Sequence, residues 1–293
     1  MSYDLYFCSK RDEVVDFNAV SAWAEAVGNF ERKEHHLWYH NKETGVYFSF
    51  EFEAGKFDSP DDNILPAGYF DSGLSFNINY NRPSFFAYEA MPLVEEITVR
   101  FNLCVFNPQG SEEVQCSIDR ESLIHSWIAT NDNAVKSMVE HAGLQQDSYM
   151  TRANSEYLWN YLRQKSDLQA ACGDQVFAPS LVPVKVKGEK NVGVAFVVGE
   201  GVVMLKPKST WIFIVLENRI FQKKKEVFAI DAGVFLQLVQ PYVDPFEWRG
   251  LDLRVIRSNS VDLVGRLLRN LTDKLPRENF EVLALDSFVD VPG

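Results

Sequence analysis

Histidines are the first residues of this sequence whose type could do chemistry. His35, His36 and His40 lie close together, a grouping that suggests a zinc site. On a strand, however, His36 and His40 share a face about 13 Å apart, at roughly 3.3 Å per residue, and His35 points to the other face. Zinc sites favour closer ligand pairs. We therefore interpret these histidines as surface or cross-strand residues and expect neither a metal nor a cofactor.

An acidic loop is a second candidate, because carboxylates on loops are common ligands of hard cations. It contains Asp58, Asp61 and Asp62. The segment lacks the alternating ligand positions, the central glycine and the closing glutamate of an EF-hand loop. The pattern favours an ordinary solvated loop. Since binding residues often lie on loops, these three aspartates are still candidate contacts for a partner.

The usual catalytic signatures are missing from the sequence. It has no G-x-S-x-G, no Walker A or G-x-G-x-x-G loop, and no C-x-x-C or H-E-x-x-H motif. None of its five histidines is well placed for acid–base chemistry. We therefore expect a non-enzymatic binding protein with no catalytic residues. The alternatives are an enzyme of unrecognised class, with a site between two domains, and a structural or scaffolding subunit.

The best positive candidate is one face of a predicted β-strand. Between Val46 and Glu53 the apolar side chains fall at every second position, the period of a strand with one apolar and one polar face. Residues 74–81 alternate in the same way, so two such neighbouring strands would present a flat patch of acidic and hydrogen-bonding groups. The candidate partner-binding residues of this patch are Tyr47, Ser49, Glu51, Glu53, Asn77 and Asn79. Such a patch suits a basic protein partner, and a plain solvated face is the equal alternative.

The elements that must position this patch form a predicted β-α-β-β-β-α-β unit over residues 1–108. In this unit a mainly antiparallel sheet has two helices on one face. The first helix is expected over 14–28, with Asp12 as its N-cap and Gly28 as its stop. The second is expected over 85–101, where Pro92 predicts either a helix start or a kink.

The rest of the chain predicts a helical bridge over 109–174 and a second domain over 175–293. In that domain, Gly199-Glu200-Gly201 separates two apolar runs, 192–198 and 202–206, in a pattern typical of a β-hairpin. The apolar run 211–216 predicts a central strand covered on both faces. The predicted fold class is therefore α+β, with two α+β domains of mainly antiparallel sheets joined by a helical segment.

Composition and charge narrow the class of partner. The chain has 293 residues, of which 46% are hydrophobic, and a formal net charge of −12. Residues 1–110 hold 8 Lys and Arg against 17 Asp and Glu. That negative field disfavours nucleic acid and anionic membranes and favours a basic protein. Acidity that serves only solubility is the simpler alternative.

The cysteines and the start of the chain bear on its location. Cys8 and Cys104 lie in apolar, strand-like segments and are expected to be reduced core residues. The first residues lack the basic and apolar regions of a secretory signal, and no apolar run approaches the roughly 18–20 residues that span a bilayer. These features predict a cytoplasmic protein without membrane contact.

Two short segments carry a family resemblance. Tyr3-Asp4-Leu5 and Thr44-Gly45-Val46-Tyr47-Phe48-Ser49-Phe50 resemble the first strand and a hairpin of uncharacterised bacterial two-domain α+β proteins. Proteins of this kind look like immunity proteins, which protect a cell from contact-delivered toxins. The resemblance implies a bacterial protein that neutralises a toxin by binding it, and it implies no catalytic residue.

Overall fold

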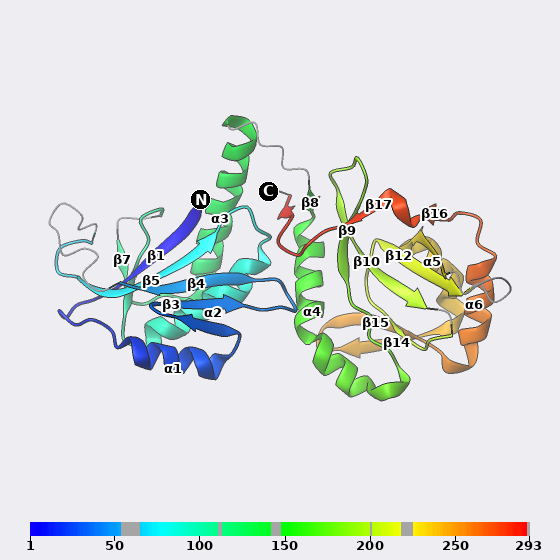
Figure 1. The fold of residues 1–293 in the computed structure, drawn as a ribbon, viewed down its shortest axis with the longest axis horizontal. Helices are drawn as coiled ribbons and strands as arrows, with labels where there is room; N and C mark the ends of the chain where they lie inside the picture. Colours follow the sequence, from blue (N-terminus) through cyan, green and yellow to red (C-terminus); the bar gives the residue numbers. More distant parts are fainter. Residues whose placement is uncertain (54–64, 111–112, 142–147, 200, 218–224, 292–293) are drawn as a thin grey trace. The chain divides into compact units, whose positions relative to one another are not determined.

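The computed structural model describes residues 1–53, 65–110, 113–141, 148–199, 201–217 and 225–291 (Figure 1). By its internal contacts the chain divides into two compact units, residues 1–146 and 147–291. Both units mix helices with mainly antiparallel strands, so the α+β fold class is confirmed. The unit boundary differs from the expected three-part division into 1–108, 109–174 and 175–293. Helix α3 (Arg120–His141) falls in the first unit and helix α4 (Arg152–Cys172) in the second.

The first unit is built on a seven-stranded antiparallel sheet with the strand order β2-β3-β4-β5-β1-β6-β7. The other helices of this unit are α1 (Phe17–Val27) and α2 (Phe85–Arg100). Its strands are β1 (Ser2–Ser9), β2 (Phe30–Lys33), β3 (His36–His40), β4 (Tyr47–Phe52), β5 (Phe70–Asn79), β6 (Cys104–Phe106) and β7 (Val114–Gln115). The predicted order of elements is confirmed with two additions, the edge strands β2 and β7, which are too short to give a clear period.

Both predicted helices form, and only the start of the first differs from the prediction. Asp16, rather than Asp12, caps α1, because its carboxylate accepts a hydrogen bond from the amide of Asn18. The helix stops at Gly28, whose φ of 83° is favourable only for glycine. Helix α2 is continuous from residue 85, so Pro92 lies inside it and does not start it.

Aromatic rings fill the core between this sheet and its helices. Phe50 of β4 meets Trp23 of α1 edge-on, with the ring centroids 6.0 Å apart. Phe52 stacks on Phe17 of the same helix at 5.0 Å. The indole of Trp23 donates to Glu96 of α2 over 2.7 Å, which links the two helices. The apolar face of β4 therefore packs toward the helices, as its alternation predicts.

The second unit contains a six-stranded sheet, a three-stranded sheet and one short parallel pair, β18 with β8. The orders are β16-β13-β12-β10-β9-β17 and β11-β15-β14. The strands are β8 (Tyr149–Met150), β9 (Val182–Val186), β10 (Val192–Gly199), β11 (Leu205–Lys206), β12 (Trp211–Glu217), β13 (Lys225–Asp231), β14 (Val243–Trp248), β15 (Leu251–Ile256), β16 (Leu275–Pro276), β17 (Phe280–Val282) and β18 (Val289–Asp290). Helices α5 (Ala232–Val239) and α6 (Val261–Arg269) complete the unit with α4.

The prediction of a β-hairpin around Gly199-Glu200-Gly201 is wrong. Strand β10 pairs with β9 and β12, whereas β11 pairs with β15 in the other sheet. The reason is that β10 is buried over most of its length and takes an interior position in the large sheet. The expectation for 211–216 is confirmed, because β12 lies between β13 and β10 and is buried on both faces. Within the described residues, no helix has the length and apolar character of a bilayer span.

Candidate functional site

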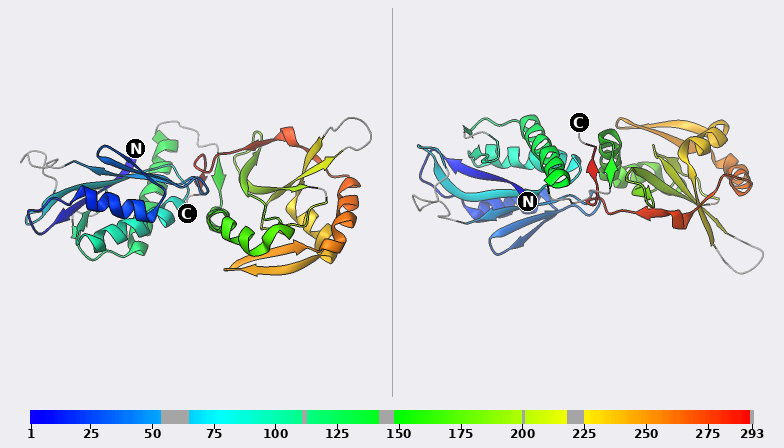
Figure 2. Two further views of the ribbon diagram at one scale, coloured as in Figure 1. Left: turned by 60° about the horizontal axis from the view of Figure 1, so that its bottom comes forward. Right: turned by 90° about the horizontal axis from the view of Figure 1, so that it is seen from above.

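The sheet of the first unit has one face toward its helices and one open face. On the helix side, Tyr3 hydrogen-bonds Ser126 of α3 over 3.0 Å, and Tyr39 donates to Glu89 of α2 over 2.8 Å. Figure 2 shows the strands and the helices as separate layers. Because side chains alternate along a strand, the neighbours of these tyrosines point the other way. We call that side the open face, and its residues are Ser2, Asp4, Tyr6, Glu31, Lys33, His36, Trp38, His40, Tyr47, Ser49, Glu51, Ser75, Asn77 and Asn79.

The register places the predicted residues beside one another. Strands β4 and β5 are neighbours, as the candidate patch required, and Ser49 lies opposite Asn77. The same row continues to Trp38 on one side and to Asp4 on the other. Strands β3, β4, β5 and β1 therefore contribute to one transverse row of polar and aromatic side chains.

The candidate residues differ in how far they reach solvent. Tyr47, Glu51, Asn77 and Asn79 are half-buried, and Glu53 is exposed just past the end of β4. Ser49 is only 3% exposed, because its short side chain lies between the larger Trp38 and Asn77 on neighbouring strands. Its hydroxyl donates to Glu51 over 3.3 Å. Ser49 therefore positions Glu51 instead of offering a surface of its own.

Trp38, Tyr47 and Arg82 form an aromatic–arginine cluster at one end of the open face. The Trp38 ring stacks on Tyr47, with centroids 5.8 Å apart, and stays 41% exposed. Arg82 Nε donates to the Tyr47 hydroxyl over 2.9 Å, and Arg82 Nη1 donates to the Asn81 carbonyl over 2.8 Å. Among the described residues, no carboxylate forms an ion pair with Arg82. Its charge therefore remains available to a partner.

The loop that carries Arg82 is fixed to helix α3. Asn131 is almost fully buried, accepts from the Asn81 amide over 2.8 Å and donates to the Arg82 carbonyl over 3.0 Å. One side chain thus satisfies two backbone groups that a turn would otherwise leave unpaired. Sequence reasoning missed Trp38 and Arg82. Trp38 shares its alternation with His36 and His40, a signal that could have found it, whereas Arg82 gave none.

Acidic side chains on the open face are held by hydrogen bonds. Asp4 accepts from the Asn77 amide, from the Ser2 hydroxyl over 3.0 Å and from the Gln109 amide over 3.5 Å. Glu51 lies 3.8 Å from His36 Nδ1, an ion pair when that histidine is protonated. These contacts fix the carboxylates in place, so the face presents negative charge at defined positions.

The net negative charge of the chain is concentrated in the first unit, which carries the open face. Residues 1–146 hold 10 Lys and Arg against 23 Asp and Glu, a net charge of −13. Residues 147–291 hold 19 against 18, a net charge of +1. The asymmetry is stronger than the one found over residues 1–110, because α3 and its approaches add further acidic residues.

A cavity of about 240 Å³ lies on the helix side of the same sheet, near the start of α3. Tyr3, Asn107 and Ser126 are among its polar lining residues. Asn107 donates to the Tyr3 hydroxyl over 2.8 Å and to the Ser126 hydroxyl over 3.3 Å. These three groups therefore satisfy one another, and Glu113, Gln115 and Ser122 add further polar side chains to the lining.

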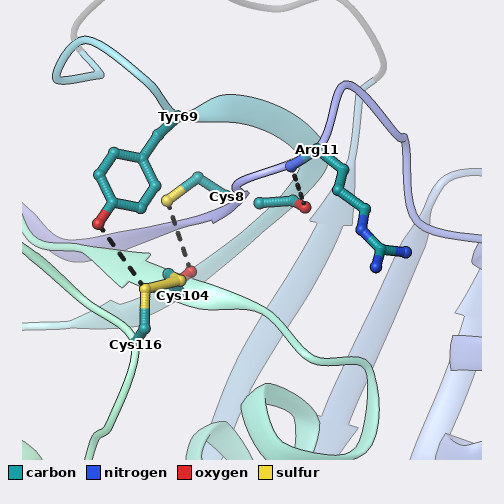
Figure 3. The surroundings of a disulfide bond; sticks show 6 residues. Cys8, Arg11, Tyr69, Cys104 and Cys116 are labelled. Carbon is teal, nitrogen blue, oxygen red and sulfur yellow. Dashed lines mark hydrogen bonds between the residues drawn. A yellow bond between two sulfur atoms is a disulfide. The ribbon is translucent and has the colours of Figure 1, made fainter.

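The cysteines correct one expectation. Cys104 is buried as expected, but it forms a disulfide with Cys116 (Figure 3). The register of β6 with β7 pairs residue 105 with 115, so residues 104 and 116 come directly opposite. Cys8 is buried and free, as expected, and its thiol points to the Cys104 carbonyl at 3.7 Å. Burial, and to a lesser degree the charge of Asp71, raise the pKa of the Cys8 thiol to about 12.

The remaining sequence candidates are the histidines and the acidic loop. His36 and His40 are exposed on β3, as surface residues should be. Within the described parts of the chain, no group of three His, Cys, Asp or Glu side chains could hold a metal ion. Asp58, Asp61 and Asp62 lie outside the described residues.

Comparison of the chain with protein-family models, with curated proteins and with solved structures finds no match. We therefore infer function from the geometry of the open face and from the charge of the unit that carries it.

Proposed function

We propose that this chain is a non-enzymatic binding protein whose open face takes a basic protein partner. The observation that carries the proposal is the aromatic–arginine cluster beside fixed carboxylates on one sheet face. Tryptophan, tyrosine and arginine are the residue types that most often dominate the binding energy of protein interfaces. Trp38 is exposed and already held by Tyr47, so it can bind without a large loss of side-chain entropy.

Charge supports a basic partner rather than an acidic one. A net charge of −13 on the first unit would attract a positively charged protein from a distance and speed its association. Arg82 carries one positive charge within this negatively charged unit. It can select a partner that presents one carboxylate or carbonyl at the matching position.

The specific role that we propose is that of a bacterial immunity protein in the cytoplasm, which neutralises a toxin domain by covering its basic surface. The support for this role is the resemblance of the 44–50 hairpin together with the charge of the first unit. A toxin that acts on nucleic acid would need a basic surface to hold its substrate, and an acidic face can occupy that surface.

The test is co-expression with the product of the neighbouring gene. We expect that product to be toxic alone, to be harmless together with this chain, and to co-purify with it. Glu51→Lys should weaken the complex about tenfold or more, because it places a like charge against a basic partner. The matched control is Glu25→Lys on the exposed surface of α1, which makes the same change of charge away from the open face.

Two results would contradict the proposal. The first is a neighbouring product that neither binds the chain nor loses toxicity in its presence. The second is an equal loss of affinity in both charge-reversal variants, since the site would then not lie on the open face.

A further inference from the structure

Two cations lie directly opposite each other in the three-stranded sheet of the second unit. Lys206 of β11 is the register partner of Arg254 of β15. In an antiparallel pair such partners project from the same face, with Cβ atoms about 4.5–5.5 Å apart. Like charges in this position repel each other and destabilise a sheet unless a negative group lies between them.

The protein itself supplies part of that negative charge. Lys206 is only 9% exposed, yet neither Lys206 nor Arg254 forms an ion pair or a side-chain hydrogen bond with the described residues. Asp252, two residues before Arg254 on the same strand face, partly offsets the repulsion. Its register partner Glu247 on β14 adds a second carboxylate to this face. Burial and the charge of Arg254 nevertheless lower the pKa of Lys206 overall.

Helix α4 adds a further donor beside this pair. The Lys208 amide donates to the Tyr157 hydroxyl over 2.9 Å, and the Lys208 ammonium lies 5.9 Å from the centre of the same ring. The hydroxyl therefore serves as an acceptor, and its own proton has no acceptor within the described part of the chain. The charge of Asp252 also raises the pKa of Tyr157, so the phenol lies within electrostatic range of the strand face that carries Arg254.

We propose that Lys206, Lys208, Arg254 and Tyr157 form a binding site for a phosphate group, either inorganic or on a small organic molecule. The three cations outweigh the carboxylates of Asp252 and Glu247 by one charge, so the site keeps a net positive charge for an anion. Charged hydrogen bonds from arginine and lysine are the strong contacts by which proteins hold such groups. Tyr157 supplies a neutral donor from the side. The site belongs to the second unit, so it does not depend on the function proposed for the open face.

The test is calorimetric titration of the full chain with inorganic phosphate at constant ionic strength. We expect saturable binding by the wild type and a loss of about tenfold or more in Lys206→Met and in Arg254→Gln, since each removes one charged hydrogen bond. Lys187→Met is the matched control, because Lys187 is exposed in the same unit. It should bind phosphate within about twofold of the wild type, as expected for a charge outside the site.

Further measurements keep the proposal falsifiable if Lys206→Met misfolds. Tyr157→Phe preserves the ring and should weaken binding several-fold, and phosphate should protect Lys206 in the wild type from an amine-reactive reagent. Tighter binding of glycerol phosphate than of inorganic phosphate would assign the site to an organic phosphate, and equal binding would assign it to the inorganic ion. Absence of saturable binding by the wild type, or equal weakening in Lys187→Met, would overturn the proposal.

Discussion

The indole of Trp38 lies nearly parallel to the phenol ring of Tyr47, with an angle of 19° between the rings. The two residues belong to neighbouring strands, and Arg82 binds the hydroxyl of the same tyrosine from the loop after β5. This arrangement makes an exposed tryptophan rigid. The core lies on the other face of the sheet, so removing the Trp38 side chain should leave the core intact.

Trp38→Ala should weaken binding of the neighbouring gene product by about 2 kcal/mol, the scale of an interface hot spot. The free energy of unfolding should fall by less than about 1 kcal/mol, because much of the side chain is already in water. Titration calorimetry and urea denaturation measure the two quantities. A change confined to stability would show that Trp38 is a packing residue only.

Phe50→Ala should destabilise the first unit by about 3–5 kcal/mol, because it leaves a cavity among Trp23 and its neighbours. Phe70→Ala is the matched control. Phe70 is 42% exposed on β5, and its loss should cost under about 1 kcal/mol. An equal loss in the free energy of unfolding of both variants, measured by urea denaturation, would show that Phe50 does not lie in the core.

Reduction of the Cys104–Cys116 disulfide should lower the free energy of unfolding by about 3 kcal/mol, the usual value for a loop of this size. The double variant Cys104→Ser with Cys116→Ser should show the same loss and no further response to reductant. Thermal unfolding with and without dithiothreitol measures the effect. A response to reductant that survives in the double variant would assign it to Cys8 or Cys172.

Thiol trapping in intact cells tests the proposed location. Cytosolic disulfides are rare because glutathione and thioredoxin keep thiols reduced. A cytoplasmic protein should therefore have Cys104 and Cys116 reduced in growing cells, so that both are alkylated when the cells are denatured in the reagent, and the bond should close on purification in air. Mass spectrometry that finds the disulfide already closed in cells would indicate an oxidising compartment and contradict the cytoplasmic part of the proposal.

Tyr80→Phe should remove part of the alkaline destabilisation of the protein. Burial is the main cause that raises the pKa of Tyr80 to about 12, from an ordinary value of 10.0. The protonated form is therefore favoured in the folded state. Its contribution to stability is complete below pH 10 and is lost as the pH rises toward 12.

At pH 7 the variant should have nearly the same free energy of unfolding as the wild type, because the buried Tyr80 hydroxyl has no hydrogen-bond partner within the described residues. Between pH 10 and 12 it should lose up to about 1.4 kcal/mol less per pH unit than the wild type. Urea denaturation at several pH values gives both results. Parallel pH profiles for the variant and the wild type would rule out Tyr80 as a source of the slope.

The sequence by itself determined the local structure of the first unit. Alternation at every second residue placed β4 and β5, because the pleat of a strand sends neighbouring side chains to opposite faces. It also separated Phe48 and Phe50 from the polar side chains that became the open face. Helix boundaries followed less closely, since Asp12 and Asp16 are both good caps and only the folded chain selects one.

The tertiary structure alone decided the contacts between distant segments. The cluster of Trp38, Tyr47 and Arg82, the pairing of Cys104 with Cys116 and the opposition of Lys206 to Arg254 each join separate elements. Local propensity cannot predict such contacts, because strand order and register depend on which apolar faces bury one another. The burial of Ser49 has the same origin, since its neighbours on β3 and β5, and not its own type, exclude water from it.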